Sequence, residues 1–206
     1  MRFGCGVVAA SLFVASPLTA GCGLDTEADE WNGWTVTVYY TAVESYHNGP
    51  LETVRGCGDF ECTDANVEIG SLPEDFVDAV RDEGTGRITS GEHASQYLNW
   101  SYDVGFWLDT EPRGTRGEAL HPFESAAADG IEPGTRLRLK GCGAAGRESE
   151  CGKFSAATWT IGDAFTPGLG GPRHLDLYIG EEDSERFTEG PDFVTFTGAT
   201  LEPIEP

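Results

Sequence analysis

The sequence predicts a mainly β protein, in which short strands close into a small barrel or pack as a sandwich. Segments such as 34–43 and 174–179 alternate in side-chain character, as strands do. Many of the 28 glycines and 11 prolines fall between such segments. There is no internal repeat and no parallel βαβ rhythm in the sequence. The 206 residues suffice for one domain with a real core, or at most two small ones.

The N-terminal residues 1–21 are predicted to be a signal peptide. Arg2 is followed by the apolar run GVVAASLFVASPLTA, which is too short for a membrane span. The sequence LTAGC resembles a bacterial lipobox, so Cys22 is the predicted lipidation site, and ordinary cleavage after Ala20 is the alternative. Residues 22–30 are polar and acidic and are expected to form a tether. The protein is therefore predicted to be exported, as an envelope lipoprotein or in secreted form.

One helix is predicted among the strands. Residues 71–84 have Pro73 near the start, acidic side chains in the first turn, an apolar stripe and Gly84 at the end. The globular composition begins at Trp31, so the domain is predicted to cover residues 31–206. Strands are predicted at 34–43, 104–109, 135–140, 154–161, 174–179 and 193–201.

The cysteines that follow Cys22 fall into two local pairs. Cys57 and Cys62 enclose CGDFEC, and Cys142 and Cys151 enclose CGAAGRESEC. In an exported chain, such pairs are typical of disulfides. A four-cysteine zinc site is the alternative, but neither spacing is that of a zinc knuckle and the compartment is oxidising. The sequence therefore predicts two disulfides, no metal ion and no cofactor.

The formal net charge of −22 restricts the partners of the protein. Binding to the phosphates of a nucleic acid needs basic side chains, so nucleic acid is excluded as a partner. Solubility outside the cell is sufficient to explain the acidity. Contact with a membrane is predicted only through a lipid on Cys22, and the protein is expected to be a monomer.

Carboxylates are the catalytic groups that the sequence supplies in quantity. None of the four histidines has metal-ligand spacing to another, and there is no G-x-S-x-G motif and no P-loop. Asp129, Asp163 and Asp176 each follow or interrupt a segment where the pattern expects burial. Taken singly, each is explained as well by a turn or a strand edge.

The stretch RHLDLYIG places a carboxylate in the middle of a predicted strand. Side chains alternate between the two faces of a strand with period two. Asp176 is therefore expected to share a face with His174 and Tyr178, while the leucines and Ile179 share the other face.

The order of the three aspartates resembles that of the three-aspartate (3D) domain of bacterial cell-wall enzymes, which includes the C-terminal part of the lytic transglycosylase A family. The first block is HPFESAAADGIEPGTRLRLK, with Asp129 in the aspartate position. The second is IGDAFTPGLGGPRHLDLYIG, with Asp163 and Asp176. TVTVYYTA, TGRITSG and FVTFTGATL are similar to the opening strand, the Thr-Ser-Gly turn and the closing strand of the family. The loop AFTPGLGGPRH departs from the family pattern, because it is longer, contains proline and lacks a lysine.

The resemblance implies a six-stranded double-psi β-barrel with an insertion around residues 47–83. It also implies that peptidoglycan glycan strands are cleaved between N-acetylmuramic acid and N-acetylglucosamine without water. The 6-hydroxyl of the sugar is then the nucleophile, so one carboxyl with a raised pKa suffices, whereas hydrolysis by the common routes needs two carboxyls. Asp176 is the expected acid/base. Asp163 and Asp129 are expected to raise its pKa and to orient sugar hydroxyls.

Further residues are expected in the wall of a glycan cleft. The resemblance indicates Tyr40, Thr41, Thr89 and Ser90 as substrate-binding residues. Four aromatic residues either stack on sugar rings or belong to the core: Tyr97, Trp100, Tyr102 and Trp107. The altered loop favours an alternative function, a barrel that binds a glycan or a partner protein and cleaves nothing. A third hypothesis is an envelope structural protein in which the aspartates only hydrogen-bond loops.

Overall fold

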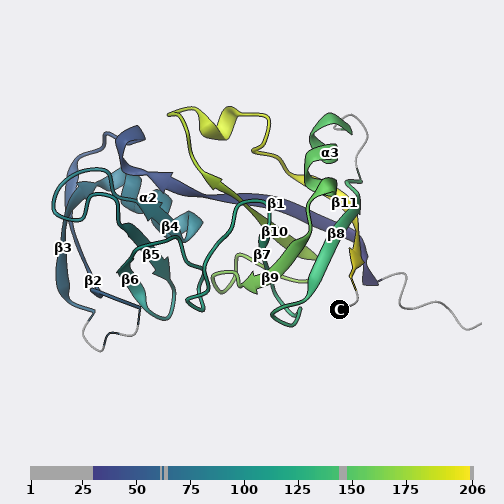
Figure 1. Cartoon of the computed structure of the whole chain (residues 1–206), viewed down its shortest axis with the longest axis horizontal. Helices are drawn as coiled ribbons and strands as arrows, with labels where there is room; N and C mark the ends of the chain where they lie inside the picture. Colours follow the sequence, from purple (N-terminus) through teal and green to yellow (C-terminus); the bar gives the residue numbers. More distant parts are fainter. Residues whose placement is uncertain (1–29, 61, 63–64, 144–147, 205–206) are drawn as a thin grey trace, which may run out of the picture.

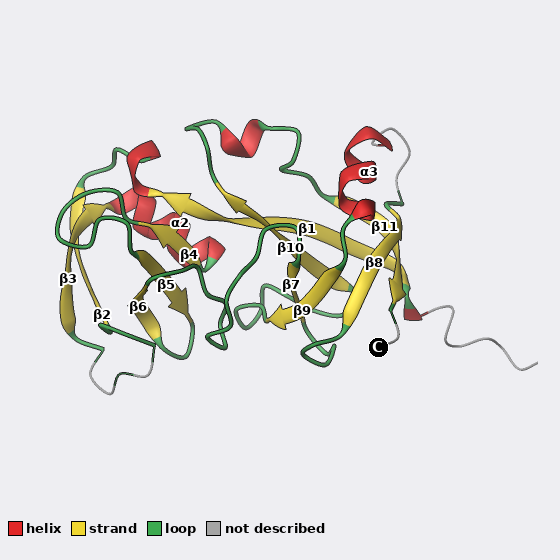
Figure 2. Cartoon of the chain, in the orientation of Figure 1, coloured by secondary structure: helices red, strands yellow, loops and turns green. Residues whose placement is uncertain are grey.

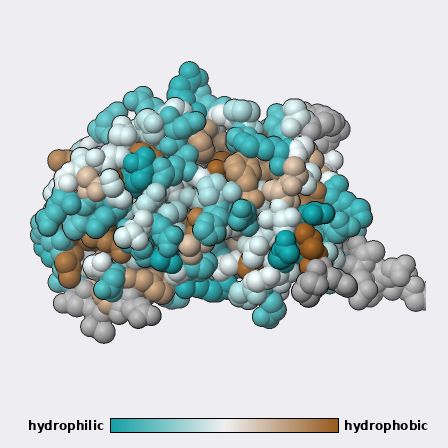
Figure 3. Space-filling view, in the orientation of Figure 1, coloured by the Kyte–Doolittle hydropathy of each residue, from teal (hydrophilic) through white to brown (hydrophobic). Residues whose placement is uncertain are grey.

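The computed structural model of the protein describes residues 30–60, 62, 65–143 and 148–204. The predicted signal peptide, the predicted lipidation site Cys22 and most of the predicted tether lie outside these residues. Within the described ranges, every helix is too short or too polar to cross a membrane. The face of the molecule in Figure 3 is mostly hydrophilic, with scattered apolar side chains, as expected for a chain with a net charge of −22.

In the described part of the chain, six strands form a closed barrel: β1 (Asn32–Val43), β7 (Ser125–Ala128), β8 (Arg136–Gly141), β9 (Trp159–Asp163), β10 (His174–Glu181) and β11 (Phe196–Pro203). Their order is β10-β7-β9-β8-β11-β1, and pairing of β1 with β10 closes the ring (Figure 2). The pairs β1–β10 and β7–β9 are parallel, and the others are antiparallel. The predicted mainly β barrel of six strands is confirmed.

Most of the chain between β1 and β7, the described residues within 44–109, forms a second lobe beside the barrel. Its elements are η1 (Glu44–Tyr46), β2 (Leu51–Gly56), β3 (Val67–Pro73), α2 (Glu74–Glu83), β4 (Thr85–Arg87), β5 (Tyr97–Ser101) and β6 (Gly105–Asp109). Figure 1 shows β1 running from the barrel into this lobe, where it pairs in parallel with β4. The lobe is longer than the predicted insertion 47–83, because β4, β5 and β6 also lie outside the barrel.

The helix α2 is the helix that the sequence predicts. Its apolar stripe of Phe76, Val77 and Val80 is fully buried. Gly84 ends the helix in a left-handed conformation with φ 86°, and its N–H donates to the carbonyl of Val80. Gly86 on β4 lies directly under the stripe, since a Cβ there would be 2.4 Å from Cγ2 of Val80. The absence of a side chain at this glycine lets the helix pack closely on the sheet.

The predicted strand 154–161 is wrong in its first part. Its residues up to Ala156 belong to a helix, α3 (Glu148–Ala156), and β9 begins only at Trp159. Phe154 and Trp159 are both fully buried, and Nε1 of Trp159 donates to the carbonyl of Phe154 at 3.1 Å. The buried apolar residues of this segment are too few and too far apart to show a period that distinguishes a helix from a strand. The other predicted strands are present, with shifted ends.

Both predicted disulfides, Cys57–Cys62 and Cys142–Cys151, are present. Their Cα atoms are 5.6 and 5.9 Å apart, within the usual range for bridged cysteines. The first bridge lies in the second lobe, and the second ties α3 to the end of β8. Stable disulfides form in oxidising compartments, so the two bridges indicate a location outside the cytoplasm.

Removing the Cys142–Cys151 bridge by the double change Cys142→Ser and Cys151→Ser should loosen α3 while the barrel stays closed. A bridge across a loop of this length contributes about 2–3 kcal/mol in the loop-entropy model. Limited proteolysis should therefore cut the 142–156 region faster than in the wild type, with an unchanged far-UV circular dichroism spectrum. The matched variant that lacks Cys57–Cys62 should keep this region protected. Equal cleavage in both variants would show that the bridge does not hold α3.

Candidate active site

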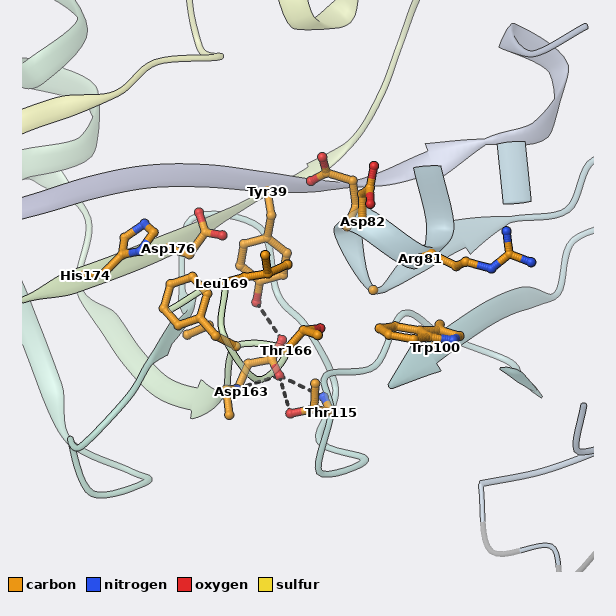
Figure 4. Close-up of a pocket in the computed structure, with 15 residues that line it drawn as sticks. Tyr39, Arg81, Asp82, Trp100, Thr115, Asp163, Thr166, Leu169, His174 and Asp176 are labelled. Atoms are coloured by element: carbon orange, nitrogen blue, oxygen red, sulfur yellow. Dashed lines mark hydrogen bonds between the residues drawn. The ribbon is translucent and has the colours of Figure 1, made fainter. Parts of the chain in front are cut away.

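A cavity of about 240 Å³ lies between the barrel and the second lobe, and it is termed the cleft below. The barrel contributes side chains of β1, β9 and β10 and of the loop after β9, and the lobe contributes the end of α2 and part of β5. Figure 4 shows Tyr39, Asp163 and Asp176 on the barrel side, with Trp100 and Arg81 on the lobe side. Four acidic residues line the cleft, namely Asp82, Glu83, Asp163 and Asp176.

Asp176 lies in the middle of β10, opposite Thr37 of β1 in the pairing register. The Thr37 hydroxyl donates to Oδ1 of Asp176 at 2.7 Å. The pKa of Asp176 is raised to about 7, mainly by burial and also by the charge of Asp163, while the Thr37 hydrogen bond acts in the opposite direction. The neighbours Leu175 and Leu177 are fully buried in the main core on the other face, as the alternation predicts. The carboxyl is therefore partly protonated at neutral pH, as a general acid must be.

Asp163 is the last residue of β9 and is 6% exposed. Its Oδ1 accepts hydrogen bonds from the backbone N–H of Thr115, from the hydroxyl of Thr115 and from the backbone N–H of Ala164, each at 2.8 Å. Its Oδ2 accepts a hydrogen bond from the hydroxyl of Tyr39 at 3.2 Å. This set of four donors suits an ionised carboxylate, which has only acceptors. Asp163 is thereby fixed as a negative charge beside Asp176.

His174 shares the cleft face of β10 with Asp176. Its Nε2 lies 2.9 Å from the hydroxyl oxygen of Thr37, and its ring centroid lies 4.5 Å from that of Phe165. Burial lowers the pKa of His174, so the ring is neutral at pH 7. When Asp176 is ionised, the Thr37 hydroxyl donates to it, so Nε2 of His174 is the donor toward Thr37. The three side chains form a hydrogen-bonded chain that fixes the orientation of the Asp176 carboxyl.

Glu83 is a second cleft carboxyl with a raised pKa. It is the last residue of α2, and its Oε2 accepts a hydrogen bond from the backbone N–H of Tyr40 at 3.2 Å. Burial and the nearby charge of Asp176 raise the pKa of Glu83 to about 8. At neutral pH this carboxyl is therefore mostly protonated.

Comparison with known proteins supports the fold. No family model and no curated protein matches the sequence. Among solved structures, the crystal structure of Escherichia coli MltA with bound chitohexaose has a TM-score of 0.53 and 14% identity, over 83% of this chain and 72% of that chain. The fold is similar to that of MltA-type lytic transglycosylases. The membrane-bound lytic murein transglycosylase of Agrobacterium tumefaciens has a TM-score of 0.53 and 11% identity, over 82% of this chain and 73% of that chain.

The sequence predicted one site that contains Asp129, Asp163 and Asp176, and the structure brings two of these three aspartates together. Asp163 and Asp176 line the cleft, and Asp129 does not. Asp129 is exposed just beyond the end of β7, where its Oδ2 accepts a hydrogen bond from the N–H of Gly171 at 3.0 Å. A Cβ on Gly170 would lie 2.2 Å from the same oxygen. Asp129 therefore supports the loop that follows β9 and is not among the residues that line the cleft.

The four residues expected in the cleft wall lie elsewhere. Because side chains alternate along β1, Tyr39 faces the cleft and Tyr40 packs on the opposite face, with its ring 5.1 Å from that of Phe187. Thr41 is fully buried, and its Oγ1 is 2.6 Å from the hydroxyl oxygen of Tyr178. Thr89 and Ser90 both donate to the carboxylate of Glu44 and hold that turn of the second lobe together.

One of the four aromatic residues faces the cleft. Trp100 lines it, while Trp107 is fully buried in the lobe and Tyr102 is 66% exposed. The hydroxyl of Tyr97 donates to Oε1 of Glu181 at 2.6 Å. Trp100 is thus the aromatic side chain that the second lobe contributes to the cleft.

Several residues of the site were not predicted as site residues: Tyr39, Glu83, Thr115 and His174, which line the cleft, and Thr37, which donates to Asp176. His174 shares a strand face with Asp176, and Thr37 shares a strand face with Tyr39. Period-two alternation along each strand could therefore have predicted that the two members of each pair point to the same side. Glu83 and Thr115 have no such signal, because the chain brings them to the cleft from a helix end and a loop.

Asp176→Asn should stabilise the protein relative to the wild type, and increasingly so as the pH rises from 4 to 8. A carboxyl with a raised pKa in the folded state contributes stability that is full below its ordinary pKa of 3.8 and is lost as the pH rises through about 7. One pKa unit corresponds to about 1.4 kcal/mol, so the loss is at most about 4 kcal/mol. Asparagine does not ionise, so the variant does not lose stability in this way as the pH rises.

The measurement is the free energy of unfolding in urea for both proteins at pH 4, 6 and 8. Asp129→Asn is the control, because Asp129 is exposed and accepts its hydrogen bond outside the cleft. A difference between wild type and Asp176→Asn that stays constant with pH would contradict the raised pKa.

Proposed function

We propose that this protein is a peptidoglycan lytic transglycosylase of the cell envelope, in which Asp176 is the acid/base that cleaves the bond between N-acetylmuramic acid and N-acetylglucosamine. The observation that carries the proposal is the buried Asp176 carboxyl, with its pKa of about 7, in the cleft of an MltA-like barrel. The bound chitohexaose of the E. coli MltA structure supports a glycan as the ligand.

The reaction needs one carboxyl that changes its protonation state. In the first step, protonated Asp176 gives its proton to the glycosidic oxygen, and the bond from that oxygen to C1 of N-acetylmuramic acid breaks. The 6-hydroxyl oxygen of the same sugar then bonds to C1, and its proton passes to the Asp176 carboxylate. The products are a 1,6-anhydro sugar and a free hydroxyl, and the enzyme regains its starting state. A pKa near the working pH serves both transfers.

The surroundings of Asp176 support this assignment. Asp163 is a fixed negative charge that favours the protonated form of Asp176 and the developing positive charge on the sugar ring. Thr37 and His174 hold the carboxyl in one orientation. Trp100 on the opposite wall offers a flat surface on which a sugar ring can stack.

Asp176→Asn should abolish the release of 1,6-anhydro-muropeptides from purified peptidoglycan, because it keeps the shape of the side chain and removes the titrating proton. General acid–base catalysis of this kind contributes about 10²–10⁴-fold in rate. In the wild type, activity should fall as the pH rises through about 7, where Asp176 loses its proton. The products are read by mass spectrometry, with circular dichroism as the control for folding.

Two outcomes would contradict the assignment of Asp176. A folded Asp176→Asn variant with wild-type activity would show that another group carries the proton. A wild type that binds glycan strands and releases no anhydro product would favour the binding-module alternative, which the altered loop after Asp163 already supports.

Asp163→Asn should move the alkaline limb of the activity profile to lower pH. The negative charge of Asp163 raises the pKa of Asp176, so its removal lowers that pKa and leaves less protonated acid at neutral pH. The comparison is Glu74→Gln, which should leave the limb in place because Glu74 is exposed at the start of α2 and lies outside the cleft. The measurement is the rate of product release between pH 5 and 9. An unchanged limb in Asp163→Asn would contradict the electrostatic role of Asp163.

A further inference from the structure

Glu83 is a buried cleft carboxyl that the proposed reaction does not use. It lies at the C-terminal end of α2, where the exposed carbonyls of a helix carry partial negative charge. The negative charge of Asp176 also disfavours the ionised form of Glu83 and raises its pKa. Two effects therefore disfavour a carboxylate here, and helix stability alone would favour lysine or arginine at this end. An acidic residue at a position that disfavours it is typical of a functional site.

The hydrogen bond of Glu83 to the backbone occupies one of its two oxygens and leaves the other for a ligand. The N–H of Tyr40 donates to Oε2 at 3.2 Å, so Oε2 is the acceptor oxygen of the neutral carboxyl. The hydrogen is then on Oε1, and no residue in the described ranges bonds that atom. Glu83 thus presents an O–H donor at the edge of the cleft, with its own position fixed by the backbone of β1.

We propose that Glu83 is a substrate-binding residue whose Oε1–H donates a hydrogen bond to an uncharged oxygen of the bound glycan, either a sugar hydroxyl or an N-acetyl carbonyl. The class of ligand rests on the proposed function. An acceptor oxygen without charge is the group that fits, because the cleft already holds four acidic residues. Glu83 belongs to α2 of the second lobe, whereas Asp163 and Asp176 belong to strands of the barrel, so the glycan would be held from both lobes.

The proposal has a consequence for pH, because the donor exists only while Glu83 is protonated. The charged and titratable groups near it are Asp176 on β10, Glu182 just after β10, Asp82 and Arg81 on α2, and the phenol of Tyr40 on β1. Asp176, Asp82 and Glu182 all favour the neutral form. Ionisation of Glu83 at alkaline pH removes the donor and adds a further negative charge to the cleft.

Glutamine is a close mimic of the neutral carboxyl at this position. In Glu83→Gln, the amide carbonyl can accept from the N–H of Tyr40, and the amide NH₂ can donate to the ligand. The variant cannot ionise, so it keeps the donor at every pH. Glu83→Ala removes the donor and the acceptor together. Glu74→Gln is a matched control, because Glu74 is exposed at the other end of α2 and lies outside the cleft.

The test is the affinity for chitohexaose, measured by calorimetry at pH 6 and pH 9 in the full chain. All variants carry Asp176→Asn, which is expected to prevent cleavage and places an uncharged side chain at position 176. Without that charge the pKa of Glu83 falls below about 8 but stays raised by burial. Binding by the parent should weaken on the order of tenfold between pH 6 and pH 9. Glu83→Gln should bind like the parent at pH 6 and keep that affinity at pH 9.

Glu83→Ala should bind on the order of tenfold more weakly than the parent at pH 6. Equal pH dependence in the parent and in Glu83→Gln would overturn the proposal, as would a folded Glu83→Ala variant with the parent's affinity at pH 6. The comparison between parent and Glu83→Gln decides the matter if Glu83→Ala does not fold. Because the readout is binding, its failure is distinct from a failure of the wild type to release anhydro products.

Discussion

The parallel pairing of β1 with β10 is the contact on which the barrel, the cleft and the second lobe all depend. It closes the ring of six strands, and its register sets Thr37 opposite Asp176. The far end of β1 continues past the barrel and pairs with β4, so the same strand carries the second lobe. A shift of one residue in this register would turn the side chains of a strand to the other face. The position of β1 therefore decides both which strand lies beside Asp176 and where the second lobe lies relative to the barrel.

The cleft gives different environments to carboxyl groups that lie close together. Asp163 accepts hydrogen bonds from Thr115, Ala164 and Tyr39, which suit a fixed charge. Asp176 is buried with fewer side-chain donors, and its pKa is raised to about 7. Environments that separate the protonation of neighbouring acids allow one to stay charged while the other carries a proton. This division is what an enzyme with a single acid/base requires.

The same arrangement opposes stability. The protein has a net charge of −22, and its cleft concentrates acidic groups where an uncharged side chain would cost less. Asp176 and Glu83 respond by taking up protons near neutral pH, because burial disfavours their charged forms. Perturbed carboxyls of this kind gather at functional sites more often than elsewhere, which favours an enzyme over a purely structural role.

The sequence by itself determined the local elements and the faces of the strands. The apolar stripe and the terminal Gly84 specified α2, the local cysteine pairs specified both disulfides, and alternation along 174–179 placed Asp176 on the face opposite Leu175 and Leu177. These features depend on neighbours a few residues away in the chain, so periodicity and spacing carry them. The helix α3 escaped prediction because Phe154 is the one buried residue among 149–156, so this helix shows no apolar stripe.

Only the tertiary structure decided which side chains meet. The aspartate order in the sequence placed Asp129 with Asp163 and Asp176, but Asp129 lies beyond the end of β7 and meets the backbone of Gly171 instead. Thr37 meets Asp176 from a different strand, and Glu83 reaches the cleft from a different lobe. Periodicity tells which face of its own strand a residue occupies. Strand register, barrel closure and the placement of the lobe arise from long-range pairing, and they decide what lies opposite that face.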